Sequence, residues 1–138
     1  MKTFTNLVLC IFVLTLISIS CKKDAVTKTK KEILTASKWK VSSEKINGVA
    51  RIFEDCSRDD FMTFAINGTY TSNPGAIKCD PSEAIYTGTW ALSSDEKELI
   101  MDGDNATILA LTETKMVLSV VDNTENPPRT MEFTFIPF

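Results

Sequence analysis

FMTFAINGTYTS, residues 61–72, is the stretch of the chain that decides its fold. Residues 61–66 are rich in apolar and aromatic side chains and predict a strand, and residues 69–72 predict the strand that returns beside it. Asn67-Gly68 between them is a strong hairpin dipeptide. A three-residue loop ending at Gly68 places Phe64 and Tyr70 on one face, whereas a two-residue loop separates them. We expect the first arrangement because it buries both rings.

The same pattern of short strands and turn signals continues along most of the chain. A short helix is expected within residues 30–39, before the first strand. We expect strands at residues 39–46, 49–53, 61–66, 69–72, 85–92, 98–101, 106–111, 115–121 and 130–136. Tight sequential turns favour an antiparallel up-and-down arrangement, and closing the sheet removes its two bare edges. The fold class is therefore all-β. We favour a small barrel of eight to nine strands over a sandwich.

Strand parity predicts which side chains face the interior of this barrel, because alternate residues of a strand point to the same face. Leu99 and Met101 share one face, as do Met116, Leu118 and Val120. The largest inward candidates could line a ligand site or fill the core. They are Trp39, Phe64, Tyr70, Trp90, Met101, Leu118, Phe133 and Phe135.

The first twenty-one residues have the layout of an export signal. Met1-Lys2 is a charged start, residues 7–17 are apolar, and Ser18-Ile19-Ser20 precedes Cys21. The apolar run is too short to span a bilayer, which needs roughly 20 residues. The segment resembles the lipobox of bacterial lipoproteins. That resemblance implies removal of residues 1–20, acyl chains (palmitate among them) on Cys21 and, with Lys22 next, the outer membrane of a Gram-negative cell. An uncleaved anchor and an ordinary secreted protein are the alternatives.

Charge divides the remaining chain into a basic linker, residues 21–31, and an acidic domain, residues 32–138. The linker contains five lysines and one aspartate, whereas the domain has 9 Lys and Arg residues against 17 Asp and Glu residues. An acidic domain argues against nucleic acid as a partner, because phosphates require a basic face.

Cysteine and histidine counts limit the available chemistry. Cys10 leaves with the signal and Cys21 is the acylation site, so Cys56 and Cys79 remain as an even pair in an exported protein. They predict a disulfide that closes a loop of 24 residues, worth roughly 3 kcal/mol. A two-cysteine metal site is the alternative. The chain has no histidine, so the usual general base and the common nucleophile pairs are absent. We expect no enzyme activity, no metal and no cofactor.

Two acidic clusters have both a functional and a structural interpretation. Asp59-Asp60 could share a proton, but neighbouring strand residues point to opposite faces, so a loop-end pair is the expected role. Residues 102–105, Asp-Gly-Asp-Asn, offer oxygen ligands for calcium but lack the EF-hand spacing, so a hairpin turn is expected.

Several short motifs resemble lipocalins. Ser37-Lys38-Trp39 opens the first strand where lipocalins have Gly-x-Trp, with serine in place of the glycine. Residues 67–70, Cys79, residues 88–90 and residues 132–135 are similar to the small lipocalin-like domains of bacterial lipoproteins, and the resemblance covers residues 32–138. Classical lipocalins also carry an arginine on the last strand that packs over the first-strand tryptophan, and this chain departs from that pattern because Arg129 precedes the expected last strand. The family implies a calyx that holds a small apolar molecule.

Together these features predict a membrane-anchored lipoprotein whose lipocalin-like barrel binds a small hydrophobic ligand non-covalently. The alternative is an interaction or inhibitor protein with a filled core. Such a protein would act through the loops at residues 54–59 and 73–83, which the two cysteines would join.

Overall fold

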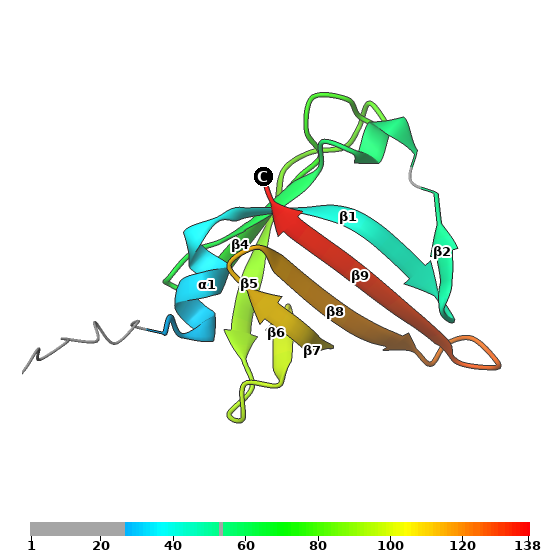
Figure 1. Cartoon of the computed structure of the whole chain (residues 1–138). Helices are drawn as coiled ribbons and strands as arrows, with labels where there is room; N and C mark the ends of the chain where they lie inside the picture. Colours follow the sequence, from blue (N-terminus) through cyan, green and yellow to red (C-terminus); the bar gives the residue numbers. More distant parts are fainter. Residues whose placement is uncertain (1–26, 53) are drawn as a thin grey trace, which may run out of the picture.

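A computed structural model describes residues 27–52 and 54–138, which form one antiparallel β-barrel with a short helix (Figure 1). The helix α1 spans Lys30–Ala36, and a 3-10 turn, η1, spans Asp55–Ser57. The strands are β1 (Lys38–Ile46), β2 (Val49–Arg51), β3 (Phe61–Phe64), β4 (Thr69–Asn73), β5 (Tyr86–Leu92), β6 (Glu98–Met101), β7 (Asp104–Thr112), β8 (Lys115–Asp122) and β9 (Arg129–Pro137).

Eight of these strands close into a barrel, as the turn pattern predicts. The strands β3 to β9 pair with their neighbours in sequence order, and β1 joins the two ends by pairing with both β3 and β9. The β1–β9 seam runs from Trp39↔Pro137 to Ile46↔Met131, with a bulge between Val41 and Ser43. Closure satisfies both sheet edges, which is the physical advantage of a barrel over an open meander.

One edge of β1 is shared by two different strands. Lys38 and Trp39 pair with β3, whereas Glu44–Ile46 pair with β2 in the Asn47-Gly48 hairpin. Figure 1 shows β2 at the end of β1 that lies away from α1. The strand β2 therefore pairs with β1 outside the closed barrel of eight strands.

The helix α1 covers the opposite end of the barrel. A capping box starts it, in which Thr29 Oγ1 accepts from the N–H of Glu32 and the Glu32 carboxylate accepts from the N–H of Thr29. Leu34 is fully buried in the core, and the indole N–H of Trp39 donates to the Leu34 carbonyl at 2.9 Å. The helix begins at Lys30, two residues before the domain boundary that charge suggests, because Thr29 supplies its cap.

Hairpin turns set the strand faces largely as expected, with small differences in extent. Phe64 and Tyr70 are directly paired and both buried, as the longer loop ending at Gly68 requires. The turn between β6 and β7 is shorter than the expected residues 102–105. Asp102 and Gly103 both have positive φ, which suits a two-residue hairpin turn, so β7 begins at Asp104.

The predicted signal peptide, residues 1–20, and Cys21 lie outside the described residues. Within residues 27–52 and 54–138, no helix has the length and apolar character needed to cross a membrane.

Candidate functional site

A cavity of about 280 Å³ occupies the end of the barrel opposite α1 and opens to solvent on one side. Its walls come from β1, β3, β4 and β6 to β9, so strands far apart in sequence contribute to it. Among the described residues that line it, ten are apolar and two, Asp60 and Ser72, are polar. An apolar cavity with few polar groups is the usual form of a small-molecule site, and its volume lies at the small end of the ~300–1,000 Å³ range of such sites.

Five of the eight residues predicted for the barrel interior line this cavity. They are Trp39, Met101, Leu118, Phe133 and Phe135. The other apolar lining residues were not among the eight interior candidates. They are Val41, Phe61, Met62, Ala106 and Val120. Val120 had been placed on the same face as Leu118 by parity, and the structure places both at the cavity.

The other three predicted residues, Phe64, Tyr70 and Trp90, are buried but do not line the cavity. Phe64 packs edge-on against Trp90 with ring centroids 5.4 Å apart, and the Trp90 indole N–H donates to the Ala65 carbonyl at 3.0 Å. These rings fill the half of the barrel nearer α1. The interior is therefore divided, with a solid aromatic half under the helix and an open half at the mouth.

Asp60 is the charged group of the cavity. It lies immediately before β3, and its Oδ1 atom is buried without a hydrogen-bond partner among residues 27–52 and 54–138. Burial raises the pKa of the Asp60 carboxyl above its ordinary value, and the carboxylates of Glu83 and Asp59 raise it further. An unpaired carboxylate beside an apolar cavity provides an acceptor for a polar group of a bound molecule.

Asp59 and Asp60 point to different partners, so they do not form a proton-sharing pair. Asp59 Oδ2 accepts from the backbone N–H of Ala76 at 2.6 Å and of Ile77 at 3.2 Å. The Ala76 N–H is the main cause of the lowered pKa of Asp59. Asp59 therefore fastens the loop between β4 and β5 to the segment before β3, which agrees with a structural role for Asp59.

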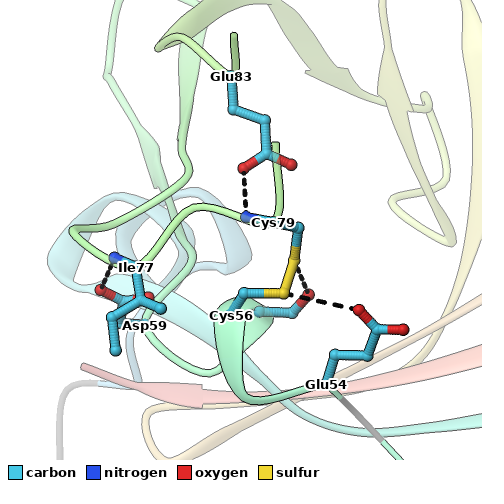
Figure 2. The surroundings of a disulfide bond; sticks show 7 residues. Glu54, Cys56, Asp59, Ile77, Cys79 and Glu83 are labelled. Atoms are coloured by element: carbon cyan, nitrogen blue, oxygen red, sulfur yellow. Dashed lines mark hydrogen bonds between the residues drawn. A yellow bond between two sulfur atoms is a disulfide. The ribbon is translucent and has the colours of Figure 1, made fainter. Parts of the chain in front are cut away.

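The disulfide Cys56–Cys79 joins the two loops beside the mouth, as the cysteine count predicts (Figure 2). The Cα atoms are 5.1 Å apart, within the ordinary range for disulfides. The Glu83 carboxylate accepts from the N–H of Cys79 at 3.1 Å, and Figure 2 shows the Asp59 interaction with Ile77 on the side of the bridge away from Glu54. The loop that carries Cys56 and the loop that carries Cys79 thus form one cross-linked unit next to Asp60.

Among the described residues, one group has side chains close enough to share a metal ion, namely Glu54, Cys56 and Cys79. Both sulfur atoms belong to the disulfide and offer no thiolate, the form of cysteine that binds metals. The oxidised protein therefore presents a single carboxylate there, which is not a metal site.

Asp102 is a polar centre on the turn between β6 and β7. Its carboxylate accepts from the backbone N–H of Thr89 at 2.7 Å and from the hydroxyls of Tyr70 at 2.7 Å and Tyr86 at 3.0 Å. The Thr89 N–H is the main cause of its lowered pKa, and the two tyrosines add to it. Burial and then the Asp102 carboxylate raise the pKa of Tyr70 to about 12. These bonds tie β4 and β5 to the β6–β7 hairpin, so the role of Asp102 is structural.

The fold and the cavity agree with comparisons to known proteins. A family model described as a lipocalin-like domain matches residues 36–118, more than half of the chain. The chain belongs to the lipocalin-like domain family. A crystal structure of a lipocalin-like protein from Bacteroides uniformis ATCC 8492 is similar, with a TM-score of 0.51 and 15% sequence identity. The alignment covers 77% of this chain and 99% of that protein, and at this identity it supports the fold alone. No curated protein matches the chain.

Membership of the lipocalin-like family also clarifies where this chain differs from the lipocalin pattern. Trp39 opens β1 and is fully buried, in the position of the family tryptophan. Arg129 does not cover it, because Arg129 starts β9 at the far end of the barrel and pairs with Asp122 at 3.2 Å. In this chain the covering element of Trp39 is α1, through Leu34.

Proposed function

We propose that this lipocalin-like protein binds a small, mainly apolar molecule non-covalently in the cavity at the barrel mouth. The observation that supports this most directly is the cavity itself, which is open, about 280 Å³ in volume and lined by ten apolar side chains. An apolar molecule that enters it removes its own surface and that of the walls from water, which is the main driving force for such binding.

The ligand is small. At ~30 Å³ for each water molecule, the cavity corresponds to about nine water-sized volumes. A chain of about eight carbons with one polar end is therefore a suitable probe. The solid aromatic half of the barrel, around Phe64 and Trp90, prevents a longer molecule from passing through to α1.

Binding can be measured on a fragment that begins at residue 22, because residues 27–138 contain the closed barrel, its helix and its disulfide. Cooperative thermal unfolding of the fragment should be checked first, as the control that it is folded. Titration calorimetry with 1-octanol should then show saturable binding. The same titration followed by tryptophan fluorescence should show a change in emission, because Trp39 lines the cavity. Native mass spectrometry of the same fragment should show a co-purified adduct that organic extraction removes.

Two neighbouring valines on β8 provide a matched pair of variants. Val120 lines the cavity, whereas Val121 is exposed on the outer face. Val120→Phe should fill part of the cavity and weaken 1-octanol binding by about tenfold or more, a loss of ~1.4 kcal/mol. Val121→Phe adds the same atoms outside and should leave binding unchanged. Equal effects of the two variants, or no binding by the wild type, would instead favour the interaction protein with a filled core.

We also propose that the protein is a lipoprotein held at the membrane through acylated Cys21, in the outer membrane of a Gram-negative cell. The support is the sequence of residues 1–21, which combines an export signal with a cysteine after small residues. Two or more acyl chains hold a protein stably on a membrane without a spanning helix. The barrel would then act as a tethered binding module rather than as an enzyme.

Metabolic labelling with a clickable palmitate analogue tests the anchor in the full chain. Cys21→Ala should abolish the label and move the protein out of the membrane fraction, while Cys10→Ala should change neither. Retention of the Cys21→Ala variant in the membrane with its label would refute lipidation at this residue.

A further inference from the structure

We infer that the ligand carries a cationic end with N–H donors, such as a primary alkylammonium group, which binds Asp60 while its alkyl chain fills the cavity. This inference rests on the proposed binding function and specifies the chemistry of the ligand. It starts from the position of Asp60, which lines the apolar cavity on one side and an outer pocket on the other. The carboxylate therefore stands where a bound molecule would pass from the apolar interior to water.

Among the described residues, Asp59 and Asp60 each have one buried carboxylate oxygen without a hydrogen-bond donor, and of the two Asp60 lines the cavity. Asp59 is engaged by the N–H groups of Ala76 and Ile77, and Glu83 by the N–H of Cys79. Asp60 Oδ1 is buried and has no partner among the described residues. A buried carboxylate oxygen without a donor is unfavourable, so a ligand that supplies one gains the full benefit of the bond.

The charges around Asp60 favour a positive ligand. Asp59 and Glu83 are close enough to act on its ionisation. Glu44 and Glu54 line the outer pocket next to it, where Arg51 is the one basic lining residue among those the structure describes. A carboxylate or phosphate end would meet this excess of negative charge and be repelled. A neutral hydroxyl would satisfy the acceptor but would not offset the charge.

A primary ammonium group also fits the polar atoms available. It has three N–H donors, and the lining residues offer the Asp60 carboxylate and the hydroxyl of Ser72 as acceptors. Hydrogen bonds between a charged donor and a carboxylate are roughly twice as strong as neutral ones. The apolar walls formed by Val41, Phe61 and Phe133 would then surround the alkyl chain.

Three probes of equal length test this inference, namely octylamine, 1-octanol and octanoate, titrated into the 22–138 fragment at pH 7. At this pH an alkylamine is protonated and octanoate is ionised. Octylammonium should bind about tenfold more tightly than 1-octanol, the size of one charge-assisted hydrogen bond, and octanoate should bind more weakly than 1-octanol.

Asp60→Asn removes the charge and keeps the shape of the side chain. It should abolish the tenfold advantage of octylammonium and change 1-octanol binding by less than about twofold. Glu113→Gln is the control for net charge, because Glu113 lies on the turn between β7 and β8 and pairs with Lys28, away from the cavity. It should leave the order of the three probes unchanged.

The outcomes separate the two proposals. If 1-octanol binds and octylammonium is no better, or if octanoate binds best, the cationic ligand is refuted while the binding function stands. An octylammonium advantage that survives in Asp60→Asn also refutes the assignment to Asp60. If none of the three probes binds the folded wild-type fragment, the binding function fails and the inference fails with it.

Discussion

Removal of the Cys56–Cys79 disulfide is expected to destabilise the barrel by an amount that follows from the chain itself. The two cysteines are 23 positions apart, so the bridge closes a loop of 24 residues that contains β3 and β4. The chain-entropy relation gives about 11.6 cal/mol/K for a loop of this length, or about 3.4 kcal/mol at 25 °C. The double variant Cys56→Ser/Cys79→Ser should lose close to this amount of unfolding free energy.

Native contacts explain why most of the value should be observed. The β3–β4 hairpin and the bonds from Asp59 to Ala76 and Ile77 already hold the two loops together in the folded state. The bridge therefore adds little order to the native state and acts mainly on the unfolded chain. A loss of a few kcal/mol is a large fraction of the ~5–15 kcal/mol total stability of a typical protein.

Urea unfolding of the 22–138 fragment, followed by tryptophan fluorescence, measures this free energy. The oxidised wild type, the reduced wild type and the double serine variant are compared. The reduced wild type and the variant should agree, which separates the loss of the cross-link from the effect of the new hydroxyl groups. The dependence on urea should also become steeper in both, because an uncrosslinked unfolded chain exposes more surface. A difference below about 1 kcal/mol between oxidised and reduced protein would refute this reasoning.

Three further predictions concern the closed end, the mouth and the polar centre. Leu34→Ala should lower the free energy of unfolding measured in urea by about 3 kcal/mol, because Leu34 is fully buried. It should also shift the tryptophan emission to the red, because α1 covers Trp39, and an unshifted spectrum would contradict this. Asp60→Asn should raise the melting temperature at pH 7, because folding raises the pKa of the Asp60 carboxyl and its ionisation therefore destabilises the folded protein. The gain should vanish near pH 3, where this carboxyl is protonated in both the folded and the unfolded protein. Asp102→Asn should lower the pKa of Tyr70 from about 12, as measured by tyrosinate absorbance, because an acceptor carboxylate is lost. Asp102→Asn should also lower the melting temperature at pH 7 and do so much less in acid. The reason is that a carboxyl with a lowered pKa stabilises the folded protein at pH values above the ordinary pKa of aspartate, and this contribution is lost in acid.

The local part of the fold could be predicted from the sequence. Alternation of side chains has a period of two in any strand, and Asn-Gly turns follow from the backbone freedom of those residues. The pairing of Phe64 with Tyr70 therefore followed from one loop, and the face that carries Leu118 and Val120 followed from parity. The disulfide followed from an even count of cysteines in a chain with an export signal.

The candidate site was predictable only in part. Five of the eight interior candidates line the cavity, but parity alone cannot tell a residue of the filled half from a residue of the open half. Phe64 and Trp90 face inward like Phe133, and they differ only in their distance from the helix that covers one end. The sequence around Asp60 predicted a loop-end pair with Asp59, because nothing in the neighbouring residues indicates the cavity beside it.

The amino-acid sequence by itself determined the kind of element, the inward face of each strand and the cysteine pairing, because these depend on residues close together in the chain or on simple counts. Tertiary structure decided where β1 changes partner from β3 to β2, which end α1 covers and which carboxylate is left without a donor. Those features arise from contacts between segments up to about a hundred residues apart, such as β1 with β9. They exist only once the sheet has closed, and they place the unpaired carboxylate oxygen of Asp60 beside an apolar cavity.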